Sequence, residues 1–202
     1  KITVIYNPIY DPSLPECARE ATGHNWLDHK DSLVIITAGR MIEQKDHATL
    51  IKAFAKVRAQ QNAKLIILGE GPLRGELEEL ISSLGLSEHI AMPGFVQNPY
   101  SWIAKANLFV LSSIYEGFGN VLVEAMSLGT PVISTNCKSG PSEILEDGKY
   151  GALVPIKDKD SLANAMSGAL NAQPDKEKLI SRAKEFSVER AAQAYFETIM
   201  KA

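Results

Sequence analysis

The sequence predicts an α/β fold in which a doubly wound parallel sheet carries helices on both faces. Short runs of Val, Ile and Leu alternate along the chain with longer segments of helical periodicity. The short runs are apolar at consecutive positions, a pattern typical of strands that are buried on both faces. Strands of this kind, each followed by a helix, indicate a parallel sheet of roughly five or six strands.

Three strand–helix pairs are expected in the first half of the sheet. The strand at 32–39 (SLVIITAG) ends at a glycine, and Asp46 is positioned to cap the helix that follows. Pro72 suits the first turn of the second helix, and Gly85 suits its end. The expected strands are 32–39, 63–69 and 89–95, and the expected helices are 46–61, 72–85 and 98–106.

The second half continues the alternation. Residues 107–113 (NLFVLSS) read as a buried strand, and the helix after it is expected to begin near Asn120. At the start of the chain, residues 1–9 (KITVIYNPI) read as a strand that enters a turn, and residues 7–30 read as irregular. The remaining expected strands are 130–135 and 151–155, and the remaining helices are 120–129, 140–147 and at least two more that end with 187–202.

Composition and charge exclude several classes of function. The 202 residues have a formal net charge of -3, and no dense block of Lys and Arg offers a footprint for nucleic acid or an anionic membrane. The longest apolar runs are shorter than the roughly 20 residues that cross a bilayer. Cys17 and Cys137 lie far apart and the four histidines share no ligand spacing, so we expect neither a disulfide framework nor a metal site. This cysteine usage fits a reducing, cytoplasmic compartment.

The first candidate site is the loop at 39–45. Ligands of doubly wound sheets bind where the carboxyl ends of the strands lead into helices. Gly39 lets the backbone turn tightly after the strand, and Arg40 and Lys45 offer a guanidinium fork and an ammonium that suit a diphosphate. On this loop alone, two solvated loop cations are an equally good interpretation.

The next two loops carry weaker signals. In 69–72 (GEGP), a third glycine at Gly75 comes one residue late for a dinucleotide-binding fingerprint, so a tight turn before a helix is the favoured interpretation. In 93–96 (PGFV), a nucleotide base can lie against the short backbone segment at Phe95 and Val96. The favoured alternative is a strand-end turn with Phe95 in the core.

The loop after the fourth strand has the richest chemistry. Gly117 and Gly119 bare backbone amides just before a helix N-terminus, an arrangement that binds phosphate. Glu116 precedes this corner and Glu124 lies about one turn into the helix, and a carboxylate can accept two hydrogen bonds from vicinal hydroxyls. A phosphate site between two such carboxylates indicates a nucleotide sugar. The alternative is that Glu116 caps a turn and Glu124 stabilises the first turn of the helix.

A fifth loop leads into the helix at 140–147. Ser139 or Gly140 is positioned to start this helix, with Pro141 at its first position. Glu143 either faces the crevice or completes a capping box with Gly140, and we favour the capping box.

Five motifs occur in order over nearly the whole chain. They are GRMIEQKD (39–46), LIILGEGP (65–72), MPGFV (92–96), LFVLSSIYEGFGNVLVEAMSLGTPVI (108–133) and GPSEILEDGKYGALVP (140–155). Together they resemble the nucleotide-binding, C-terminal half of retaining GT-B glycosyltransferases of the group 1 superfamily. The most specific motif is the family signature of two glutamates separated by seven residues, here Glu116 and Glu124.

The resemblance implies a role for each matched residue. Arg40 and Lys45, next to Gly39, would hold the donor diphosphate and help it depart as the leaving group. Glu116 would contact the hydroxyls of the donor sugar, and Glu124 those of the ribose. The other implied contacts are backbone amides to the sugar and distal phosphate from Gly117, Phe118, Gly119, Asn120 and Val121, and the loop of Phe95 and Val96 beside the base.

The resemblance also implies a reaction. Such enzymes transfer the sugar with retention and without a metal ion or cofactor, and Arg and Lys can stabilise the charge that develops on the diphosphate. The combination of EGFGNVLVEA with SGPSEIL is similar to members that use UDP-hexoses or UDP-N-acetylhexosamines in polysaccharide or lipid-linked glycan assembly. A UDP-sugar is therefore the expected donor, and a glycan or lipid-linked compound is the expected acceptor.

One departure from the family concerns domain organisation. GT-B enzymes have two Rossmann-like domains and bind the acceptor mainly through the N-terminal one, whereas this sequence matches only the second. We expect one donor-binding domain over 1–202: a lead-in segment at 1–31, a Rossmann-like core at 32–186, and a helix at 187–202 that turns toward the other domain and has a partly unpaired apolar face. Alone, this chain is expected to be inactive or nearly so. Any peripheral membrane association would involve only the other domain.

Two other functions compete with this one. A non-catalytic nucleotide-sugar-binding module on the same fold has the same residues. An NAD-dependent dehydrogenase is disfavoured, because the position of Gly75 breaks the glycine fingerprint.

Overall fold

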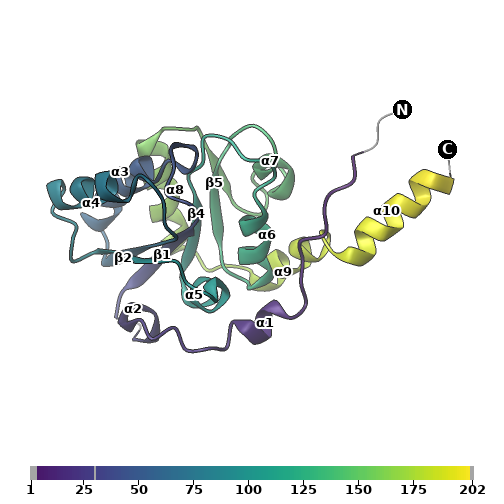
Figure 1. The fold of residues 1–202 in the computed structure, drawn as a ribbon, viewed down its shortest axis with the longest axis horizontal. Coiled ribbons are helices and arrows are strands. Elements are labelled where there is room, and N and C mark those ends of the chain that lie inside the picture. The colour runs from purple at the N-terminus through teal and green to yellow at the C-terminus, as the bar shows by residue number, and fades with distance from the viewer. Residues whose placement is uncertain (1–3, 30, 201–202) are drawn as a thin grey trace.

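A single six-stranded parallel sheet with the order β3-β2-β1-β4-β5-β6 forms the centre of the molecule (Figure 1). The computed structural model describes residues 4–29 and 31–200. This strand order is that of a Rossmann sheet, so the predicted doubly wound, Rossmann-like fold class is confirmed. The strands are β1 Leu33–Ala38, β2 Ala63–Leu68, β3 Ile90–Gly94, β4 Leu108–Leu111, β5 Val132–Thr135 and β6 Ala152–Val154.

From residue 47 onward the helices follow the predicted alternation, whereas two short helices lie in the segment 7–30, which was expected to be irregular. The described residues form α1 Leu14–Cys17, α2 Asn25–Asp28, α3 His47–Arg58, α4 Arg74–Ser83, α5 Pro99–Lys105, α6 Asn120–Ser127, α7 Pro141–Ile144, α8 Lys159–Asn171, α9 Lys176–Lys184 and α10 Val188–Met200, with a 3-10 helix, η1, at Glu43–Lys45. None of them is long and apolar enough to cross a membrane.

Successive strand residues point to opposite faces and feed two separate cores. Ile35 of β1 and Leu65 of β2 pack with α3, α4 and α8 on one face. Their neighbours Ile36 and Ile66 pack with α5, α6, α7 and α9 on the other face. All four side chains are fully buried, and each contributes about 1.5–3 kcal/mol relative to exposure. This two-sided burial explains why the strands read as continuous apolar runs.

Several predicted helix ends are confirmed. Asp46 caps α3, because its side chain accepts a hydrogen bond from the Thr49 amide at 3.2 Å. Gly85 follows the end of α4 with φ of +67°, a conformation that favours glycine. Pro72 lies in the turn before α4 rather than within its first turn, because the helix begins only at Arg74.

Neither residues 4–9 nor the last helix, α10, belongs to the sheet. Residues 4–10 form no strand, and the Ile9 and Tyr10 amides donate main-chain hydrogen bonds to the Phe186 carbonyl rather than to a strand. The expected strand is therefore wrong over these residues, and its first three residues lie outside the described ones. At the other end, α10 projects away from the sheet (Figure 1) and has no buried residue. Its exposed apolar side chains are Val188, Tyr195, Phe196, Ile199 and Met200.

The sheet reverses its winding direction between β1 and β4. The chain leaves β1 toward α3 on one face and leaves β4 toward α6 on the other. A crevice forms at the carboxyl ends of strands where the winding reverses in this way. The loops 39–46 and 112–119 are the two that border it.

Candidate active site at the carboxyl edge of the sheet

The loop after β1 brings Lys45 back against Gly39. A Cβ atom at Gly39 would lie 3.3 Å from Cε of Lys45, so the absence of a side chain at this position gives the lysine its path. η1 ends at Lys45, and the Ser112 hydroxyl after β4 donates a 2.7 Å hydrogen bond to the Lys45 carbonyl. These contacts aim the ammonium at the loop after β4.

The Lys45 ammonium and the Glu116 carboxylate form an ion pair across the crevice. Nζ lies 2.7 Å from Oε1, and the side chains are only 20% and 9% exposed. The Ser113 hydroxyl donates a 2.5 Å hydrogen bond to the same oxygen. Since Oε1 accepts both bonds, and Oε2 accepts none from the described residues, Oε2 remains available to a ligand hydroxyl.

Main-chain contacts hold the two loops in register. The Ile114 amide donates to the Gln44 carbonyl at 2.7 Å, and the Gln44 side chain donates to the Tyr115 carbonyl at 2.9 Å. The Thr135 hydroxyl at the end of β5 donates to the Ser113 carbonyl at 2.5 Å. The ion pair is thus built on a hydrogen-bonded frame from three strand ends.

The glycine corner ends where the sequence predicts. α6 begins at Asn120, and its N-cap Gly119 is buried with φ of +95°. The first amides of a helix have no partner within the helix and carry partial positive charge. Four predicted contact residues lie around this N-terminus. Gly117 and Asn120 are exposed, and Phe118 and Val121 are half-buried.

Glu124 occupies a half-buried position about one turn into α6. Burial raises the pKa of Glu124, and no described residue neutralises it with an ion pair. Burial, followed by the charge of Glu124, raises the pKa of Tyr100 on α5, so the two side chains interact. A carboxylate held without a cation in a desolvated place is a candidate binding residue.

The loops after β1, β2 and β3 border a mainly apolar cavity of about 410 Å³ that is open to solvent. Phe95 borders it and is 81% exposed, so the favoured alternative that Phe95 lies in the core is wrong. Gly94 has φ of +87° and turns the chain outward at the end of β3. The lining residues are Ala38, Gly39, Arg40, Leu68, Gly69, Glu70, Phe95, Val96 and Pro99.

The glycines of the GEGP loop have a packing role. A Cβ atom at Gly69 would lie 2.2 Å from the Gly39 carbonyl oxygen, and one at Gly71 would lie 2.4 Å from that of Met41. The Met41 amide donates to the Glu70 carbonyl at 2.9 Å, and the Gly69 amide donates to that of Gly94 at 2.8 Å. The loops after three adjacent strands are therefore pressed together, main chain on main chain.

Arg40 differs from Lys45. Its side chain is exposed, and it forms no ion pair or side-chain hydrogen bond with residues 4–29 or 31–200. The structure thus brings Lys45, Glu116 and the glycine corner together and leaves Arg40 free at the rim of the cavity beside Phe95 and Val96.

Sequence reasoning missed the residues that support this arrangement. Ser113 precedes Glu116 by three positions, a spacing that suits a local hydrogen bond and was a usable signal. Gln44 carried no such signal. The favoured capping box is confirmed at α7, where the Gly140 amide donates to Glu143 Oε1 at 3.3 Å.

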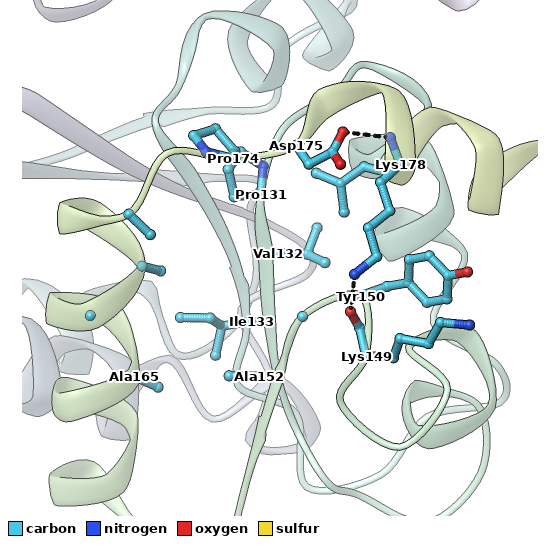
Figure 2. A pocket seen from close by; sticks show the side chains of 15 residues that line it. Pro131, Val132, Ile133, Lys149, Tyr150, Ala152, Ala165, Pro174, Asp175 and Lys178 are labelled. Carbon is cyan, nitrogen blue, oxygen red and sulfur yellow. Dashed lines mark hydrogen bonds between the residues drawn. The ribbon is translucent and has the colours of Figure 1, made fainter.

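A second apolar cavity of about 460 Å³ lies at the opposite edge of the sheet (Figure 2). It is lined by the residues that enter β5 and β6 and by small side chains of α8 such as Ala165. Lys178 crosses it and donates to the Lys149 carbonyl at 3.1 Å. None of the predicted site residues lines this cavity, and it faces the amino ends of the strands, so the carboxyl-edge crevice is the better site.

Comparison with known proteins identifies relatives over most of the chain. Residues 20–186 match the family model of glycosyl transferases group 1. The chain is 35% identical over 190 residues to the N-acetylgalactosamine-N,N'-diacetylbacillosaminyl-diphospho-undecaprenol 4-alpha-N-acetylgalactosaminyltransferase of Campylobacter jejuni, covering 92% of this chain and 50% of that protein. It is 49% identical over 117 residues to the uncharacterized glycosyltransferase MJ1059 of Methanocaldococcus jannaschii, covering 57% of this chain and 29% of that protein.

A solved structure shares the fold. The Anabaena protein Alr3699/HepE, crystallised with UDP and glucose, superposes with a TM-score of 0.76 at 26% identity, over 99% of this chain and 57% of that protein. The chain spans half or less of the length of the two curated relatives. Because the family model covers most of the sequence, from residue 20 to residue 186, the chain belongs to the group 1 glycosyl transferases.

Proposed function

We propose that this chain is the donor-binding half of a retaining, metal-independent GT-B glycosyltransferase. It would bind a UDP-sugar and support transfer of a hexose or N-acetylhexosamine to a glycan or lipid-linked acceptor. The observation that carries the proposal is the Lys45–Glu116 ion pair beside the N-terminus of α6. It places a cation, a carboxylate and a set of helix amides at one point of the crevice.

Each group at this point has a task in the proposed reaction. Negative charge grows on the distal phosphate as the bond from the sugar carbon to its oxygen breaks. Lys45, the α6 amides and the free guanidinium of Arg40 would stabilise that charge, which is the task that a metal ion performs in other transferases. The free oxygen of Glu116 would accept a hydrogen bond from a sugar hydroxyl and orient the ring.

The base and the ribose would occupy the other end of the crevice. The cavity beside Phe95 and Val96 is apolar and open, which suits a base that stacks on one side. Glu124 would accept hydrogen bonds from the two ribose hydroxyls. Burial, which raises the pKa of Glu124, already removes water from the carboxyl, and the ribose hydroxyls would replace that water.

The choice of donor and acceptor draws on the relatives. The Anabaena neighbour was crystallised with UDP and glucose, and the Campylobacter relative is named for transfer of N-acetylgalactosamine to a diphospho-undecaprenol acceptor. Since this chain spans half of that relative's length, we assign acceptor binding to the other half of a longer protein. We also propose a cytoplasmic location, where UDP-sugars are at hand and both free cysteines stay reduced.

A thermal-shift scan tests the donor. UDP or a UDP-sugar at millimolar concentration should raise the Tm of this chain, because a ligand that binds only the folded state stabilises it. GDP, ADP and their sugars serve as matched controls for the base. No response to any of these nucleotides would contradict the proposal.

Sugar transfer by the longer protein separates the enzyme from a non-catalytic module. Loss of one cation that stabilises the leaving group should reduce kcat by about 100- to 1000-fold, so Arg40→Ala should nearly abolish transfer. Lys52→Ala, on the exposed side of α3, is the control for a lost surface cation. Nucleotide binding without any transfer by the wild-type protein would favour the non-catalytic module.

A further inference from the structure

Three aromatic rings from distant parts of the sequence meet behind the glycine corner. The Tyr6 ring lies 5.1 Å from the Phe118 ring and 5.8 Å from the Phe186 ring, and Phe118 and Phe186 lie 5.7 Å apart. Phe118 is the central residue of the Gly117–Gly119 corner. Tyr6, in the lead-in segment, therefore touches the loop that borders the crevice.

Glu143 ties the same segment to the loop by a second route. Its Oε2 accepts a 2.6 Å hydrogen bond from the Tyr6 hydroxyl, and its Oε1 accepts one from the Gly140 amide at 3.3 Å. This hydrogen bond, followed by burial, raises the pKa of Tyr6, so the phenol keeps its proton and remains a donor.

Gly140 packs directly against the main chain of Phe118. A Cβ atom there would lie 1.7 Å from the Phe118 carbonyl oxygen, and its φ of +90° favours glycine. The corner is thus pressed against the N-terminus of α7 on one side and covered by the Tyr6 ring on the other. Phe118 therefore has contacts with both Tyr6 and the start of α7.

The lead-in segment is itself anchored near this point. The Ile9 and Tyr10 amides both donate to the Phe186 carbonyl, at 2.8 and 2.9 Å. The guanidinium of Arg182 lies 4.9 Å from the Phe186 ring and donates to the Ile144 carbonyl of α7. These bonds fix the chain three residues after Tyr6, and so restrict where the Tyr6 ring can lie against Phe118.

We propose that Tyr6 is a positioning residue that holds the Gly117–Gly119 corner in the conformation that binds the sugar and distal phosphate of the donor. This inference rests on the proposed function of the crevice. Tyr6 itself does not touch the donor: it acts through Phe118 and Glu143. A movement of the lead-in segment changes the corner, and hence the affinity for the sugar end of the donor, without altering the base end.

Hydrogen exchange of the ligand-free chain tests the contact directly. In Tyr6→Ala the Leu122 amide, which donates to the Gly119 carbonyl at 2.9 Å, should exchange at least about 10-fold faster than in the wild type, because the corner opens locally. Tyr6→Phe keeps the ring contacts and loses only the hydrogen bond to Glu143, so its increase should be smaller. Val4→Ala changes an exposed side chain of the same segment and should have no effect. Equal exchange in wild type and Tyr6→Ala, with β1 unchanged in both, would overturn the proposal.

Calorimetric binding of UMP and UDP-glucose tests the consequence. UMP lacks the distal phosphate and the sugar, so Tyr6→Ala should leave its Kd unchanged and raise that of UDP-glucose about 10-fold. An equal change for both ligands, or no change for either, would refute a positioning role at the sugar end. If the wild type bound neither ligand, nor GDP or ADP, the proposed function would fail, while the exchange measurement would still decide whether Tyr6 holds the corner.

Discussion

Replacement of Lys45 by Ala provides a quantitative test of the ion pair at the centre of the crevice. Breaking a buried pair costs about 3–5 kcal/mol, because the remaining charge stays desolvated. Glu116 would retain the Ser113 hydroxyl, and the lysine is 20% exposed in the wild type. We therefore expect a loss near the lower end of that range, about 3 kcal/mol.

Thermal and urea unfolding of the ligand-free chain measures this loss. For a chain of this size, 1 kcal/mol corresponds to about 2–4 °C in Tm, so the Tm should fall by about 6–12 °C. The double variant Lys45→Ala/Glu116→Gln removes the unpaired charge as well and should regain more than half of the loss.

Lys56→Ala is the matched control. Lys56 pairs with Asp160 on the surface, where the two side chains are 49% and 60% exposed. Such exposed pairs contribute about 1 kcal/mol or less. If Lys45→Ala lowered the Tm no more than Lys56→Ala, or if the second substitution at Glu116 restored nothing, the account of a desolvated pair would be wrong.

Three further substitutions probe other parts of the site. Glu124→Gln should raise the ligand-free Tm at pH 7 and weaken nucleotide binding, because burial raises the pKa of Glu124; the stabilisation should vanish below about pH 4.5, where the carboxyl is protonated in both states. Burial, and then the charge of Lys45, lowers the pKa of His47 from 6.5 to about 4, so wild-type stability should fall by up to roughly 3 kcal/mol as the pH drops from 6.5 to 4, and urea titrations of His47→Leu should show a flatter profile. Gly140→Ala should cost at least about 3 kcal/mol in urea unfolding, because both its φ and the Phe118 carbonyl oppose a Cβ atom, whereas Gly168→Ala, inside α8 with open space around it, should stabilise the chain by up to about 1 kcal/mol.

Local patterns predicted the sheet and the helices well. Consecutive apolar residues identify a strand that is buried on both faces, and caps such as Asp46 fix where a helix starts. The glycine corner was also predictable, since Gly119 immediately precedes the helix that begins at Asn120. These features depend on neighbours within a few positions.

Features set by distant contacts were not predictable. Phe95 is an aromatic residue at the end of an apolar strand, which is typical of a core position. It is nevertheless exposed, because the chain turns at Gly94, where φ is positive. The roles of Gly69 and Gly71 depend on loops that follow a different strand. Nothing near Tyr6 indicates that it meets residues more than a hundred positions away.

The close approach of the loops after β1, β2 and β3 limits which residues those loops can carry. Gly69 and Gly71 rest on the carbonyl oxygens of residues 39 and 41, so the loops after β1 and β2 meet main chain against main chain. A side chain at either glycine would push the loop that carries Arg40 and Lys45 away from the cavity that Phe95 borders, so one substitution would disturb both ends of the crevice.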